Sequence, residues 1–142
     1  MEALRARYNP SMGKIDGQSW LEQAQQDLEA ARASAAAGHF EWACFQAQQA
    51  AEKALKGFLL MAGREHQRTH SVTQLLDECT RLEPLFGQLR PAAELDLYYV
   101  STRYPDALAG GPPHRAFSRD MASKCLSLGS SLIEFVTRLT SS

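Results

Sequence analysis

Residues 40–60 read FEWACFQAQQAAEKALKGFLL, and this stretch decides the fold class of the chain. At about 100° per residue, its apolar side chains gather on one side of a single long helix that continues to residue 62. The residues on that side are Phe40, Cys44, Ala47, Ala51, Ala54, Leu55, Phe58 and Ala62. Because alanine predominates there, a neighbouring helix can pack at close range. The stretch therefore predicts a central helix.

The opposite side of this helix is polar. It carries Gln46, Gln49, Lys53 and Lys56. A lysine presents a mobile charge with three donors, so Lys53 and Lys56 are candidates for contact with a phosphate. The same lysines also suit an ordinary solvated helix face, with Glu41 and Glu52 as nearby countercharges. Both interpretations stay open at this stage.

Signals for further helices flank the central one. A Ser19-x-x-Glu22 capping box predicts a helix that runs to Gly38 and forms a hairpin with the central helix. Ser71 with Gln74 predicts a second N-cap, for a helix that ends before Pro84. Further helices are expected from Pro91 to about residue 104, and from Ser118 to about residue 139, with a loop over 106–115 between them.

No segment of useful length alternates apolar and polar residues with period two, so a sheet is not expected. The predicted fold is an all-α, antiparallel (up-and-down) bundle of about five helices. Residues 1–17 contain two glycines and one proline with little periodicity, and they are predicted to be an extended N-terminal arm ahead of a domain at 18–142.

Composition limits the classes of function. The 142 residues carry a formal net charge of −1, so any phosphate contact must come from a local cluster of cations. There is neither an apolar run of membrane-spanning length nor a signal-peptide pattern, which predicts a cytoplasmic protein with no membrane partner. The three cysteines lie within helical patterns and are predicted to be reduced core residues.

Four motifs in this order resemble the HEPN family, the nucleotide-binding domain of higher eukaryotes and prokaryotes. They are Trp20-x-x-x-Ala24-x-x-Asp27-Leu28-x-x-Ala31, the run from Trp42 to Lys56, His70-Ser71, and Thr102-Arg103-Tyr104-Pro105-Asp106. The likeness spans roughly residues 18 to 139. The arrangement of the motifs is similar to that in stand-alone prokaryotic HEPN proteins and in the C-terminal HEPN domain of sacsin.

The resemblance implies a helical bundle that pairs as a homodimer and binds a nucleotide, such as ATP or GTP, or a similar anion near the dimer interface. It also implies a partner of the small nucleotidyltransferase class for prokaryotic members. Lys53, Lys56, Arg103 and Tyr104 are the predicted contacts, since arginine can hold phosphate in a bidentate manner and tyrosine can stack on a base. The alternative for Arg103 is that it contacts no ligand and only stabilises the turn in which it lies.

One branch of the family comprises metal-independent RNases of toxin–antitoxin pairs, which use an arginine followed after four to six residues by a histidine. Arg64 and His70 have that spacing, whereas the first histidine after Arg103 is His114. The cationic residues of this connection also suit simple stabilisation of the C-terminus of the central helix. RNase activity at Arg64 and His70 is therefore the alternative to binding without catalysis, and a module that only dimerises is a further alternative.

No cofactor is predicted, and no metal site either, because His66 and His70 lack a third and fourth ligand nearby. Trp20, Trp42 and Phe45 suit either the core or an interface, since large aromatic residues anchor both. Trp20 is assigned to the core.

Overall fold

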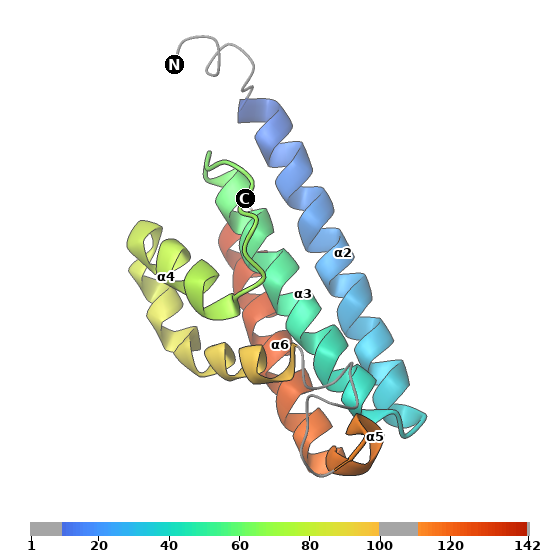
Figure 1. Ribbon diagram of the computed structural model, residues 1–142. Helices are drawn as coiled ribbons and strands as arrows, with labels where there is room; N and C mark the ends of the chain where they lie inside the picture. Colours follow the sequence, from blue (N-terminus) through green and yellow to red (C-terminus); the bar gives the residue numbers. More distant parts are fainter. Residues whose placement is uncertain (1–9, 100–110, 142) are drawn as a thin grey trace.

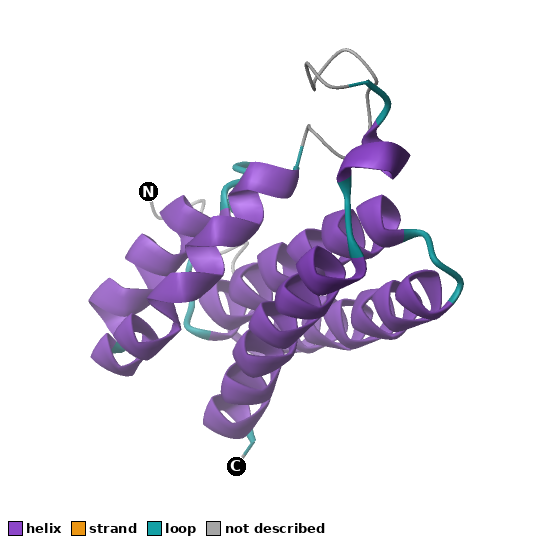
Figure 2. Cartoon of the chain, turned by 90° about the horizontal axis from the view of Figure 1, so that it is seen from below, coloured by secondary structure: helices purple, strands orange, loops and turns teal. Residues whose placement is uncertain are grey.

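A computed structural model describes residues 10–99 and 111–141 of the chain, and all regular structure within these ranges is helical (Figures 1 and 2). The predicted all-α bundle is confirmed. The elements are the α-helices α2 (Pro10–Ala36), α3 (Phe40–Met61), α4 (Val72–Leu82), α5 (Pro113–Ala116) and α6 (Arg119–Thr140), and the 3₁₀ segment η1 (Pro84–Tyr98).

As predicted, α2 and α3 form an antiparallel hairpin, and they pack against each other along much of their length (Figure 1). Gly38 turns the chain between them with a φ of 84°, a conformation that suits glycine. The helix α6 lies along α3 and runs in the same direction, while α4 and η1 pack together on another side of α3 (Figure 1). The predicted alanine-rich face of α3 is buried among these neighbours, with Ala47, Ala51 and Ala54 fully inaccessible.

The first helix is longer than the sequence suggested. It begins at Pro10, so the expectation of an extended arm is wrong for residues 10–17, and Ser19 does not start the helix. Gly17 lies within the helix, where α2 crosses close to Gly57 of α3. The assignment of residues 1–9 to an arm lies outside the described residues, and the domain boundary at residue 18 stays a prediction.

The predicted caps of two later helices are confirmed. Ser71 Oγ accepts a hydrogen bond from the backbone N–H of Gln74, and Ser118 Oγ accepts one from that of Met121. The prediction of an α-helix between these two capped helices is wrong. Instead of an α-helix beginning at Pro91, a 3₁₀ segment begins at Pro84 and contains Pro91, whose ring and missing N–H disrupt an α-helical ladder at that point.

The loop expected at 106–115 is described from residue 111, and its last part forms the single helical turn α5. The three cysteines are free and buried, which confirms that they belong to the core. Around them, Leu55, Leu76, Phe86 and Leu132 are among the largest fully buried side chains.

Candidate functional site

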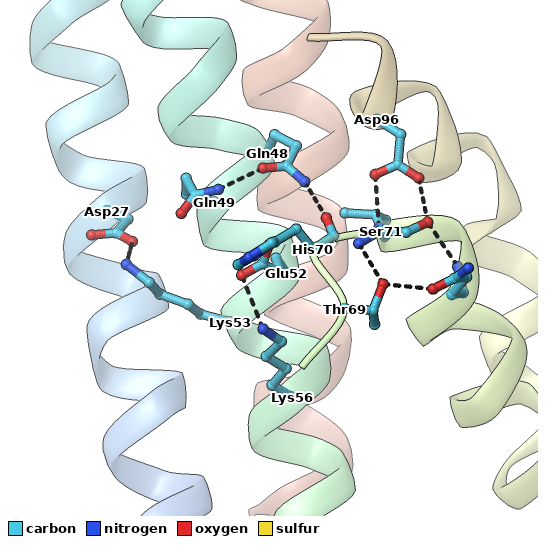
Figure 3. Close-up of polar contacts among 12 residues, drawn as sticks. Asp27, Gln48, Gln49, Glu52, Lys53, Lys56, Thr69, His70, Ser71 and Asp96 are labelled. Atoms are coloured by element: carbon cyan, nitrogen blue, oxygen red, sulfur yellow. Dashed lines mark hydrogen bonds and ion pairs between the residues drawn. The ribbon is translucent and has the colours of Figure 1, made fainter. Parts of the chain in front are cut away.

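The connection between α3 and α4, residues 63–71, folds back over the polar side of α3 (Figure 3). This arrangement covers polar side chains of α3, among them Lys56, which a helical wheel places toward solvent. Gln48 is fully buried, and Glu52 and Lys56 are each 3% exposed. Of the four residues on the predicted polar side, Lys56 is therefore internal, whereas Gln46, Gln49 and Lys53 are partly exposed.

Glu52 is the centre of this buried region. One of its carboxylate oxygens lies 3.3 Å from Lys56 Nζ, and the other lies 3.1 Å from Nδ1 of His70 (Figure 3). Removing either charge from a buried pair leaves its partner without compensation, so such a pair requires both members. Glu52 thereby joins α3 to the end of the connection.

Two glutamines hold the backbone at the same point. Gln48 Nε2 donates to the carbonyl oxygen of His70 at 2.9 Å, and Gln49 Nε2 donates to Gln48 Oε1 at 2.8 Å. These bonds pair the polar groups of the buried Gln48 amide. Leaving those groups unpaired would destabilise the fold. The His70 ring remains accessible, with its side chain 59% exposed, and stacks on Tyr99 with ring centroids 5.4 Å apart.

Both lysines predicted to bind an anion have internal partners. Lys53 donates to Asp27 of α2 at 2.5 Å, across the helical hairpin. Lys56 lies over the ring of Trp20, with Nζ 5.5 Å from the ring centroid, and another neighbour of Trp20 is the ring of His66 at 5.2 Å. The expectation that Lys56 faces solvent is wrong, because the connection and Trp20 cover it.

The arginines of the connection differ from these lysines. Arg64 and Arg68 are exposed, and neither forms an ion pair with any residue in the described ranges. They lie on the same short segment as His66 and His70, which is anchored to the bundle through Trp20 and Glu52. Contacts with α2 and α3 thus fix the position of this segment, which presents two guanidinium groups to solvent.

The far end of the connection is fixed by Asp96 of η1. Its carboxylate accepts hydrogen bonds from Ser71 Oγ, from the backbone N–H groups of Val72 and Thr73, and from Thr73 Oγ1, at 2.7–3.0 Å. Partial burial raises the pKa of Asp96, but the hydrogen bonds from Thr73, Val72 and Ser71 outweigh it and lower the pKa below its ordinary value.

The structure brings together only some of the predicted site residues. Lys53 and Lys56 lie on α3, and Arg64 and His70 lie on the connection that crosses it. Arg103 and Tyr104 lie outside the described residues. Sequence reasoning named Glu52 as a countercharge of the lysines, which its pair with Lys56 confirms. It missed the contact of Glu52 with His70 and the roles of Gln48 and Asp96.

Two further findings concern metals and membranes. Within residues 10–99 and 111–141, no three His, Cys, Asp or Glu side chains are grouped so as to hold a metal ion. None of the helices described is both long enough and apolar enough to traverse a lipid bilayer.

Solved structures with the same architecture share substantial sequence with this chain. TT1696 from Thermus thermophilus is 41% identical, with a TM-score of 0.81 over 87% of this chain and 97% of that one. ST0689, described as an archaeal HEPN homologue, is 34% identical, with a TM-score of 0.73 over 87% and 97% of the two chains. A HEPN domain protein from Thermotoga maritima is 32% identical, with a TM-score of 0.67 over 85% and 96%.

A more distant relative has a name that describes it as a putative toxin. The chain is 24% identical over 126 residues to a Methanocaldococcus jannaschii protein named "Putative toxin MJ1304", covering 82% of this chain and 83% of that protein. The family model described as "HEPN domain" matches residues 18–139, as the four motifs predicted. Together with the shared helical architecture, this match shows that the chain belongs to the HEPN family.

Proposed function

We propose that this HEPN domain binds the phosphate groups of a nucleotide, or a similar anion, at the connection between α3 and α4. The observation that carries the proposal is the pair of exposed arginines, Arg64 and Arg68, which have no ion-pair partner among the described residues. Arginine suits this task because its planar fork matches the oxygens of a phosphate.

The surrounding contacts support the same proposal. Lys53 joins α3 to α2 through Asp27, and Lys56 pairs within α3 with Glu52, whose other oxygen contacts His70 of the connection. A backbone that is fixed before the ligand arrives loses less conformational entropy on binding. Arg103 and Tyr104 remain predicted contacts, as do the homodimer and the nucleotidyltransferase partner.

Calorimetry with tripolyphosphate and with ATP and GTP tests the proposal. The Arg64→Ala/Arg68→Ala double variant should bind at least about tenfold more weakly, since a hydrogen bond to a charged group contributes about 1.5–3 kcal/mol. Arg81→Ala is the matched control, because Arg81 already pairs with Glu78. Equal affinities of the double variant and the unaltered chain would refute phosphate binding at the connection.

RNA cleavage at Arg64 and His70 is the second candidate, and one contact favours it. The buried Glu52 carboxylate next to His70 Nδ1 fixes the ring and its tautomer, which leaves Nε2 as the nitrogen for proton transfer. The relative named as a toxin is consistent with such an activity. Cleavage of RNA in EDTA, and arrest of growth on expression, should both disappear in His70→Ala, and cleavage by that variant at the original rate would exclude the residue.

A further inference from the structure

The connection between α3 and α4 carries an arginine or a histidine at every second position. Residues 64–70 run without a helix, turn or bend, and the even-numbered ones are Arg64, His66, Arg68 and His70. Successive side chains of an extended backbone point to opposite sides, so residues two apart share a side. The four side chains therefore form one row, which is named the basic row below.

Contacts on the two sides of the segment agree with this alternation. His66 packs against Trp20 of α2, with ring centroids 5.2 Å apart. His70 Nδ1 lies 3.1 Å from a carboxylate oxygen of Glu52 on α3. Thr69, between these two histidines, instead donates from Oγ1 to a side chain of α4 (Figure 3). The basic row thus lies along the hairpin of α2 and α3, and the odd-numbered side chains are turned toward α4.

The charge of the basic row depends on pH. Its four members are all exposed, whereas Gln67 and Thr69, which alternate with them, are half-buried. Arginine is charged at every pH at which proteins fold, and histidine gains its charge as the pH falls from about 8 to about 5. The row therefore carries two permanent charges and two that appear on protonation.

The groups that face His70 favour its protonated form. One oxygen of Glu52 contacts Nδ1, while the other oxygen of Glu52 pairs with Lys56, and the ring of Tyr99 stacks on the imidazole. An opposite charge at hydrogen-bond distance stabilises an added proton. With Nδ1–H directed to Glu52, the Nε2–H of a protonated His70 is left to donate to an anion.

His66 has a different set of neighbours. Lys56 Nζ lies 5.5 Å from the centroid of the same Trp20 ring that His66 contacts. The face of this ring attracts a cation, whereas Lys56 and the neighbouring Arg64 and Arg68 oppose an additional positive charge. A bound anion offsets that repulsion. Protonation of His66 and binding of the anion consequently favour each other, because coupling between two binding events is reciprocal.

We propose that anion binding at the connection is coupled to protonation: His66 and His70 take up protons when phosphate groups bind Arg64 and Arg68, so that affinity falls as the pH rises. This inference rests on the proposed function, because the same connection supplies the two arginines. Groups that gain protons on binding strengthen it on the acidic side of their titration, and the gain is lost as the pH rises through that titration.

Calorimetry with a short vinylsulfonate oligomer measures the coupling, because sulfonate groups stay ionised and take up no protons themselves. The unaltered chain should bind it about tenfold more tightly at about pH 5.5 than at about pH 8, since two charged contacts are gained. Near about pH 6.5, titrations in buffers of different ionisation enthalpy should show net uptake of protons on binding. This second measurement needs no variant.

The variant His66→Gln/His70→Gln assigns the protons. Glutamine still donates hydrogen bonds but gains no charge, so this variant should lose most of the increase in affinity at acidic pH and most of the proton uptake. His39→Gln is the matched control, because His39 precedes α3 whereas the connection follows the other end of that helix, and it should show the same pH dependence as the unaltered chain. Urea midpoints of both variants verify that they fold.

The results separate this inference from the proposed function. Binding that is lost in Arg64→Ala/Arg68→Ala but is equally tight at both pH values would overturn the proton coupling alone. The coupling is also wrong if His66→Gln/His70→Gln keeps the full pH dependence and proton uptake. If neither vinylsulfonate nor tripolyphosphate binds the unaltered chain at either pH, the proposed function and the coupling are both overturned.

Discussion

Gly17 and Gly57 face each other where α2 crosses α3, at a distance that leaves no room for a side chain. A Cβ on Gly57 would lie 2.7 Å from the carbonyl oxygen of Gly17, and a Cβ on Gly17 would lie 2.6 Å from that of Gly57. Both obstructing atoms belong to backbone, so the helices themselves would have to separate. The two glycines thus set the spacing of the hairpin, which Lys53 and Lys56 bridge through Asp27 and Trp20.

Gly57→Ala should therefore destabilise the fold by about 1–3 kcal/mol, the usual range for overpacking. Gly87→Ala is the matched control, because nothing lies within 4 Å of a Cβ added there. It should be neutral or slightly stabilising, since alanine restricts the unfolded chain. Urea denaturation of both variants gives the comparison, and equal midpoints would show that the hairpin tolerates the wider spacing.

The buried pair of Glu52 and Lys56 predicts non-additive substitutions. Lys56→Met should cost about 3–5 kcal/mol, because it leaves the Glu52 carboxylate buried without its lysine. The double variant Glu52→Leu/Lys56→Met should recover much of that loss, since neither charge then remains to be compensated. A double-mutant cycle by denaturation measures the coupling. Purely additive losses would mean that the two residues contribute independently of their contact.

The sequence predicted the bundle because apolar spacing determines which side of a helix is covered. It also predicted the caps at Ser71 and Ser118, which depend on local geometry. It did not predict the start of α2, because the Ser19-x-x-Glu22 pattern, preceded by Gly13 and Gly17, is typical of a helix that begins at Ser19. In the structure Gly17 is needed for close packing against Gly57, a reason that becomes visible only when both helices are in place.

The candidate site was predicted less well, for a related reason. A helical wheel gives the direction of Lys56 but not what lies in that direction. The connection at 63–71 returns over the polar side of α3 through contacts made by Gln48, Glu52 and Trp20, and these contacts join residues 18–46 positions apart in the sequence. The local pattern therefore identified the polar side correctly, but its exposure depended on tertiary contacts.

The three cysteines should resist alkylation while the chain is folded. Burial raises the pKa of the Cys79 thiol, and a hydrogen bond with Cys44 together with burial raises that of Cys125, so the reactive thiolate is scarce at both. Mass spectrometry after iodoacetamide treatment near neutral pH should show no adducts on native protein and three on protein unfolded in urea. Rapid modification of a thiol in the folded chain would contradict its place in the core.

Asp96 predicts a dependence of stability on pH. Its pKa is lowered in the fold from an ordinary value of 3.8, so its contribution is fully present above that value and is lost as the pH falls through the folded pKa. At neutral pH, Asp96→Asn should cost about 1 kcal/mol, the typical loss at a helix cap, because an amide nitrogen would face the donors of Val72 and Thr73.

The difference in unfolding free energy between the unaltered chain and Asp96→Asn should consequently shrink as the pH falls below about 4, because a protonated Asp96 also loses its charge. Asp77→Asn serves as the control, since Asp77 pairs with Arg90 on an exposed part of the surface and such pairs contribute little. Urea titrations of the three proteins across the acidic range measure the effect. If the Asp96→Asn difference stayed constant down to the lowest pH, the hydrogen bonds to Ser71, Val72 and Thr73 would not depend on the carboxylate charge, and Asp96 would hold the connection by shape alone.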